Sequence, residues 1–172
     1  MALAEEMRTF VTVDMNAMVR NVETVKAHLP AGIKVAVVVK ADAYGHGAAH
    51  VGKYLEKVAD YYAVATIEEA IDQRKLGVTV PILVLGYTLR AQYGLLARYN
   101  VEQTIYTLES AMALSASAQA AGKTIRVHIA VDTGMGRLGF LPTEENADLV
   151  RKISKLPSLE IVGLFTHFSA AD

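Results

Sequence analysis

The sequence contains no cysteine and no tryptophan, and it has only four prolines among its 172 residues. Without cysteine the chain forms neither a disulfide nor a thiolate-ligated metal site, which fits a cytoplasmic protein. No apolar run approaches the roughly 20 residues that cross a bilayer. The opening segment MALAEEMRTF lacks the basic and then apolar pattern of a signal peptide. A formal net charge of -1 gives no reason to expect nucleic acid or a membrane surface as a partner.

The composition predicts a packed globular domain in which strands and helices alternate. Hydrophobic residues make up 52% of the chain, and a chain of this length suffices for one domain with a sizeable core. We expect strands at residues 34–39, 61–65, 82–85, 101–105, 124–131 and 159–165. Helical patterns lie between them, and four begin with a threonine at the N-cap position, namely Thr66, Thr88, Thr107 and Thr143.

Regular alternation of strands and helices indicates parallel strands joined by right-handed crossovers. Two architectures fit this pattern, a doubly wound open sheet and a (β/α)8 barrel, and the pattern alone does not separate them. A complete barrel needs about 250 residues. If the fold is a barrel, the chain carries about six of the eight βα units and lacks strands seven and eight.

The most informative stretch is VAVVVKADAYGHG at residues 35–47. Its apolar run predicts a strand that is buried on both faces and ends at Lys40. Lysine is almost never fully buried without a partner or a chemical task, and an amine in an apolar pocket is suited to attack a carbonyl carbon. The alternative is a strand-end lysine that reaches solvent before an ordinary glycine-containing turn. We interpret Asp42 and His46 as residues of that turn.

The string VVKADAYGHG resembles the cofactor-lysine signature of alanine racemases, which are pyridoxal 5'-phosphate (PLP) enzymes built on a barrel. Two more strings, VDTGMGRLGF at 131–140 and GLFTHFSAAD at 163–172, resemble the same family in the same order. The resemblance favours an α/β fold of the (β/α)8 TIM type, incomplete, with the barrel portion in residues 14–172. It also implies that residues 1–13 form a strand that packs with a C-terminal β domain absent from this chain.

The resemblance implies roles for five residues. Lys40 would bind PLP covalently through an imine and act as the base on one face of the substrate's α-carbon. Tyr44 would bind the cofactor phosphate, and Leu85 would form the apolar surface under the cofactor. Arg137 would contact the cofactor's phenolic oxygen and the substrate carboxylate, and His167 would lie beside the pyridine ring. For the last four, the alternative is an ordinary core or surface residue.

The activity implied by the resemblance is the interconversion of L-alanine and D-alanine by a homodimer, supplying D-alanine for peptidoglycan. In that family a second base comes from the C-terminal domain of the partner subunit. We therefore expect residues 1–172 alone to bind PLP weakly and not to racemise. Two alternatives are a serine or broad-specificity amino-acid racemase on the same scaffold and a PLP-carrier barrel without turnover.

One position departs from the family pattern. Ala130 stands where many members carry a lysine that becomes carbamylated and braces the arginine. Arg137 would then be oriented by another group, such as a chloride ion, or be held more loosely. His28, His50 and His128 have no partner at metal-ligand spacing, so we expect no metal site.

Overall fold

The computed structural model describes residues 9–171, and a six-stranded parallel sheet forms its centre. Its strands are β1 (Ala36–Val38), β2 (Tyr61–Val64), β3 (Ile82–Val84), β4 (Glu102–Ile105), β5 (Ile125–Val131) and β6 (Leu159–Thr166). The helices are α1 (Met15–Ala27), α2 (Lys40–Gly45), α3 (Ala48–Leu55), α4 (Ile67–Lys75), the 3-10 helix η2 (Arg90–Gln92), α5 (Tyr93–Tyr99), α6 (Leu108–Ala120) and α7 (Glu144–Ile153). All six predicted strands are present, with ends that differ by at most two residues. The prediction that the strand before Lys40 is buried on both faces was wrong, because Ala36 and Val38 of β1 are exposed.

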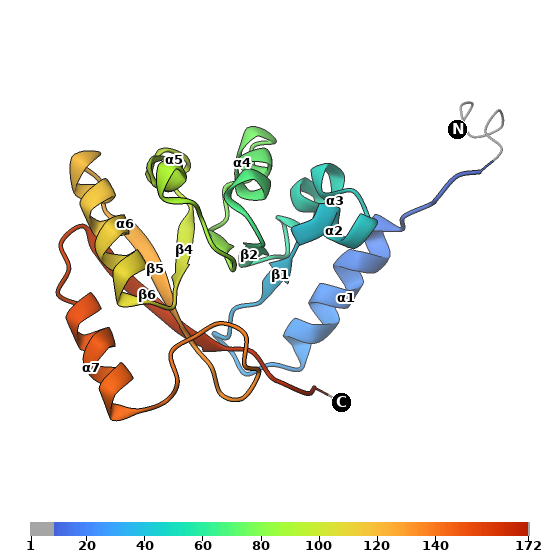
Figure 1. Ribbon diagram of the computed structural model, residues 1–172. Coiled ribbons are helices and arrows are strands. Elements are labelled where there is room, and N and C mark those ends of the chain that lie inside the picture. Colours follow the sequence, from blue (N-terminus) through green and yellow to red (C-terminus); the bar gives the residue numbers. More distant parts are fainter. Residues whose placement is uncertain (1–8, 172) are drawn as a thin grey trace.

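The order of the strands decides between the two predicted architectures. Each strand pairs in parallel with its predecessor, so the sheet runs β1-β2-β3-β4-β5-β6 without a reversal. A doubly wound sheet reverses its strand order at a switch point, which places helices on both faces. Here successive right-handed crossovers keep the helices on one side, and Figure 1 shows α3 to α7 along the outer side of the strands. This confirms the incomplete TIM-type barrel with six strands.

The hydrophobic core lies between the sheet and the helices. Its largest fully buried apolar side chains come from both layers: Tyr62, Ile82, Ile105 and Ile129 from the strands, and Leu55, Ile67, Leu96, Leu114 and Ile153 from the helices. Full burial of one such aliphatic side chain stabilises the fold by about 1.5–3 kcal/mol. No helix within residues 9–171 combines the length and apolar character needed to span a membrane.

Four helix caps are formed, three at predicted threonines and one at Asp14. Asp14, Thr66, Thr107 and Thr143 each accept a backbone N–H from the first turn of the helix that follows, at 2.9, 3.4, 3.1 and 3.3 Å. Such caps satisfy backbone donors that have no partner inside the helix. They fix where α1, α4, α6 and α7 begin, and thus how each connection leaves its strand.

The cap predicted at Thr88 was wrong. Thr88 is buried, and its hydroxyl donates to Gln103 Oε1 at 2.6 Å, while the segment after it forms η2 and then α5. Gln103 is a buried polar residue of β4 and must find hydrogen-bond partners inside the protein. Pairing with this amide therefore replaces the capping role.

Residues 9–13, the described part of the segment before α1, form no strand. Residues 9–13 pair with no strand of the described chain, and Phe10 and Val11 are exposed. Residues 1–8 of the predicted strand lie outside the described residues. The prediction that this segment packs with a further domain stays a prediction.

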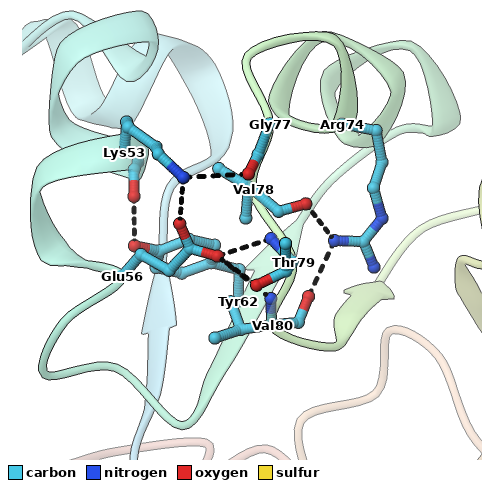
Figure 2. A network of polar contacts seen from close by, with 9 residues as sticks. Lys53, Glu56, Tyr62, Arg74, Gly77, Val78, Thr79 and Val80 are labelled. Carbon is cyan, nitrogen blue, oxygen red and sulfur yellow. Dashed lines mark hydrogen bonds and ion pairs between the residues drawn. The ribbon is translucent and has the colours of Figure 1, made fainter.

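At the amino ends of the strands, two charged side chains brace the connections (Figure 2). The carboxylate of Glu56 accepts hydrogen bonds from Thr79 N and Oγ1, at 2.5 and 2.6 Å, and from Lys53 Nζ at 2.7 Å. The guanidinium of Arg74 donates to four main-chain carbonyls, those of Val78, Val80, Tyr99 and Asn100, at 2.8–3.1 Å. These contacts fix the end of the sheet opposite to the predicted site.

Candidate active site

The carboxyl ends of the strands border a cavity of about 350 Å³. Its wall brings together all five residues predicted from the sequence, namely Lys40, Tyr44, Leu85, Arg137 and His167. Parallel strands direct their carboxyl ends to the same edge of a sheet, so residues that follow different strands meet there. The cavity wall thus combines an amine, a phenol, a guanidinium and an imidazole with an apolar leucine.

Lys40 and Tyr44 are placed by an unusual turn, which sequence analysis did not foresee. Helix α2 is left-handed over Ala41–Tyr44, where the four φ angles lie between 50° and 54°. For L-amino acids this conformation costs roughly 1–2 kcal/mol per residue. The turn brings Lys40 Nζ to 5.9 Å from the centroid of the Tyr44 ring, within cation–π range. It therefore presents both side chains to one cavity at a cost that other contacts must offset.

Several hydrogen bonds tie this left-handed turn to its surroundings. Asp42 Oδ1 accepts from Ala48 N at 2.7 Å, which joins the turn to the start of α3. His46 Nδ1 lies 3.0 Å from a carbonyl oxygen within the turn. Glu69 Oε1, which belongs to α4, accepts from Ala41 N at 2.7 Å. The contacts of Asp42 and His46 agree with their interpretation as turn residues.

Arg137 belongs to a loop that an aspartate organises from within. Asp132 Oδ1 accepts the backbone N–H groups of Gly134 and Gly136, each at 3.0 Å. The hydrogen bond from Gly136 and then that from Gly134 lower the pKa of Asp132 below its ordinary value. Gly136 has a φ of 67°, which favours glycine at that bend. The carboxylate thus shapes the loop through main-chain groups.

The same loop is closed at its base and joined to the next strand. Phe140 N donates to the carbonyl of Ala130 at 2.9 Å, and the carbonyl of Phe140 accepts from Asp132 N at 2.9 Å. Thr133 Oγ1 lies 2.7 Å from Thr166 Oγ1, at the end of β6. These contacts join the Arg137 loop to the strand that precedes His167.

The family pattern of the alanine racemase N-terminal domain matches residues 13–172. The chain belongs to the alanine racemase family. Among its curated relatives, the alanine racemase of Clostridium tetani is 44% identical over 161 residues, which are 93% of this chain and 41% of that protein. Alanine racemase 1 of Clostridium acetobutylicum is 51% identical over 136 residues, 78% of this chain and 35% of that protein. The chain thus spans about two fifths of the length of these alanine racemases.

Solved structures of racemases share the fold of this chain. An alanine racemase from Clostridium difficile 630, in complex with cycloserine, matches with a TM-score of 0.86 at 41% identity, over 88% of this chain and 42% of that one. A histidine racemase from Leuconostoc mesenteroides subsp. sake matches with a TM-score of 0.83 at 30% identity, over 91% of this chain and 42% of that one. This barrel portion therefore occurs in racemases named for different amino acids.

The departure at Ala130 lies in the cavity itself. Ala130 is buried and lines the wall together with Thr104 and Phe165. Its methyl group has no polar atom with which to contact Arg137. In this alanine racemase barrel, the loop that carries Arg137 is shaped by Asp132 through the main chain instead.

Sequence analysis missed a polar network beneath the cavity. Glu102, only 1% exposed, accepts from Tyr61 Oη at 2.6 Å and from His128 Nε2 at 2.7 Å, and its Oε1 lies 2.9 Å from the Arg126 guanidinium. Burial alone would raise the pKa of Glu102, but the hydrogen bonds from His128 and Tyr61 lower it. Burial, together with the Glu102 carboxylate, raises the pKa of Tyr61 to about 12. These partners favour the ionised form of the Glu102 carboxyl inside the barrel.

A signal for this network was present in the sequence. Glu102 and Thr104 are two residues apart on β4, and His128 and Ala130 are two residues apart on β5. Side chains two residues apart on a strand face the same side, so each pair lies on one face of the sheet. Thr104 and Ala130 line the cavity, and Glu102 and His128 lie one step below them. Among the described residues, no group of three or more histidine or carboxylate side chains is placed to hold a metal ion.

Proposed function

We propose that this chain is the barrel portion of a PLP-dependent alanine racemase, which interconverts L-alanine and D-alanine and so supplies D-alanine for peptidoglycan. The observation that carries the proposal is the meeting of Lys40, Tyr44, Arg137 and His167 around one cavity. These residues come from three sequence strings that are far apart in the chain. Membership of the alanine racemase family supports the same activity.

The side chains around the cavity fit PLP in their chemistry. An amine suits the aldehyde of the cofactor, and a phenol and a guanidinium suit its anionic oxygens. The imidazole of His167 and the apolar side chain of Leu85 suit the faces of a planar ring. We infer that Lys40 binds PLP covalently, that Tyr44 contacts its phosphate, and that Arg137 contacts its phenolic oxygen.

When bound, PLP supplies an electron-poor ring that makes the α-proton of an attached amino acid acidic. The Lys40 amine then takes that proton on its own side of the substrate's α-carbon and can return it. The planar guanidinium of Arg137 binds the substrate carboxylate through two parallel hydrogen bonds and so orients the α-carbon. Racemisation needs a second base on the opposite side, and we infer that it lies outside this chain, in the partner subunit of a homodimer.

The length of the relatives supports the organisation that we propose for the whole protein. Residues 14–172 are the barrel portion, and residues 1–13 pack with a C-terminal β domain. The relatives are more than twice as long as this chain, which leaves ample length for that domain. We propose a cytoplasmic homodimer.

The decisive experiment measures alanine racemisation and PLP attachment in the protein that carries residues 1–172. Lys40→Ala should abolish PLP attachment and lower the rate by about a thousandfold or more, since it removes a base and the covalent anchor together. Lys34→Ala, which removes an exposed lysine close by in the sequence, should change neither. Racemisation that survives Lys40→Ala would contradict the assignment.

The histidine racemase among the structural relatives supports a second candidate, a racemase for another amino acid. A panel of alanine, serine and histidine, each assayed from both enantiomers, separates the two. Alanine should give the highest kcat/KM. Tight PLP binding without turnover of any amino acid would instead indicate a PLP carrier.

A further inference from the structure

We propose that Glu69 is a positioning residue for Lys40, because its carboxylate fixes the first peptide group of the left-handed turn. The inference rests on the proposed function and assigns to this site a residue of α4. Glu69 touches neither the cavity nor the reacting atoms. It would act on Lys40 through the main chain.

The carboxylate of Glu69 joins the ends of two neighbouring strands. Its Oε2 accepts from Ala65 N at 2.7 Å and from Thr66 N at 3.4 Å, which completes the capping box at the start of α4. Its Oε1 accepts from Ala41 N at 2.7 Å, directly after Lys40. A capping box needs only one of these oxygens. The second oxygen is thus free to hold the segment that follows β1.

The contact with Ala41 fixes the main chain on the carboxyl side of Lys40. The Ala41 N–H belongs to the peptide group that begins at the Lys40 carbonyl, so its orientation sets the ψ angle of Lys40. Four non-glycine residues with positive φ follow at once. A turn in this sparsely populated conformation persists only where its surroundings impose it. A hydrogen bond to a carboxylate is about twice as strong as one between neutral groups.

Two other contacts hold the turn, one at each end, but neither involves the peptide group between Lys40 and Ala41. Asp42 Oδ1 binds Ala48 N, which lies beyond the turn, and Ala43 N donates to the carbonyl of Val39 at 3.1 Å. Among the described side chains, Glu69 is the one that binds the peptide between Lys40 and Ala41. Its removal should therefore release Lys40 before it unfolds the helix.

The test compares Glu69→Gln and Glu69→Ala with Thr66→Ala in the protein that carries this chain. Gln keeps the length of the side chain and is accepted at this position of a capping box, but its amide has one oxygen for the Ala41 N–H and the two N–H groups at the start of α4. Thr66→Ala removes the helix cap and leaves the contact of Glu69 with Ala41. PLP is added, the condensation of the Lys40 amine with its aldehyde releases one water, and the product is reduced by sodium borohydride. Peptide mass spectrometry then gives the rate of labelling at Lys40.

We expect Glu69→Gln to slow labelling of Lys40 by about tenfold and Glu69→Ala by more, while Thr66→Ala lowers the melting temperature and leaves labelling unchanged. Wild-type labelling in both Glu69 variants would overturn the inference, and so would equal slowing by Thr66→Ala. If Glu69→Ala does not fold, Glu69→Gln still decides. Labelling by PLP that never falls on Lys40, even in the wild type, would instead refute the proposed function.

Discussion

The brace at Glu56 gives a stability prediction that can be worked out from the structure. Burial by itself would raise the pKa of this carboxyl, but hydrogen bonds from Lys53 and Thr79 outweigh it and lower the pKa from 4.5 to about 2. A shift of that size corresponds to roughly 3 kcal/mol at 1.36 kcal/mol per unit. Lys53 is more than half exposed, so solvent screens part of the interaction. We expect Glu56→Gln to lower the free energy of unfolding by about 1–2 kcal/mol at neutral pH.

The pH dependence follows from the direction of the shift. Because folding lowers this pKa, the contribution of Glu56 is complete above pH 4.5 and declines as the pH falls toward about 2. Urea unfolding of the wild type and of Glu56→Gln, from neutral pH down to about pH 3, should therefore show two curves that converge on acidification. Glu23→Gln, at an exposed carboxylate of α1, is the matched control and should follow the wild type. Parallel loss of stability in wild type and Glu56→Gln would refute the reasoning.

Three further substitutions test the packing around the site. In Gly163→Ala, the added Cβ would lie 2.3 Å from His128 Nδ1, so urea unfolding should show a loss of about 1–3 kcal/mol that largely disappears in a His128→Ala background. In Gly139→Ala, the Cβ would lie 2.5 Å from a main-chain nitrogen at a φ of 132°; limited proteolysis should then cut within residues 132–139 faster than in the wild type. Glu102→Gln should lower the free energy of unfolding, measured in urea, by about 1–3 kcal/mol, because Tyr61 and His128 lose hydrogen bonds to a charged carboxylate. An unchanged unfolding midpoint would contradict the role of the network.

The β/α order and the residues of the cavity could be predicted from the sequence. Period and composition located all six strands. The resemblance added Leu85 and His167 to Lys40, and parallel strands bring their carboxyl ends together, so these three residues meet at one edge. The choice of a barrel came from a resemblance, and the unreversed strand order now gives an independent reason for it.

The features that escaped prediction depend on contacts between distant segments. An alanine-containing string such as KADAYG favours a right-handed helix, and its left-handed form is imposed by groups from elsewhere, including Glu69. Thr88 resembles a helix cap until Gln103 is placed beside it. The partners of Glu102 come from β2 and β5, and alternation along a strand shows which residues share a face but not that they are in contact.

The unbroken strand order has a consequence for synthesis on the ribosome. Every strand pairs with the one made immediately before it, so each newly translated strand meets a neighbour that is already in place. At about 5–20 residues per second, a βα unit of roughly 20 residues emerges within a few seconds. The nascent sheet therefore grows by one strand at a time, and its unpaired edges are always those of β1 and of the strand translated last.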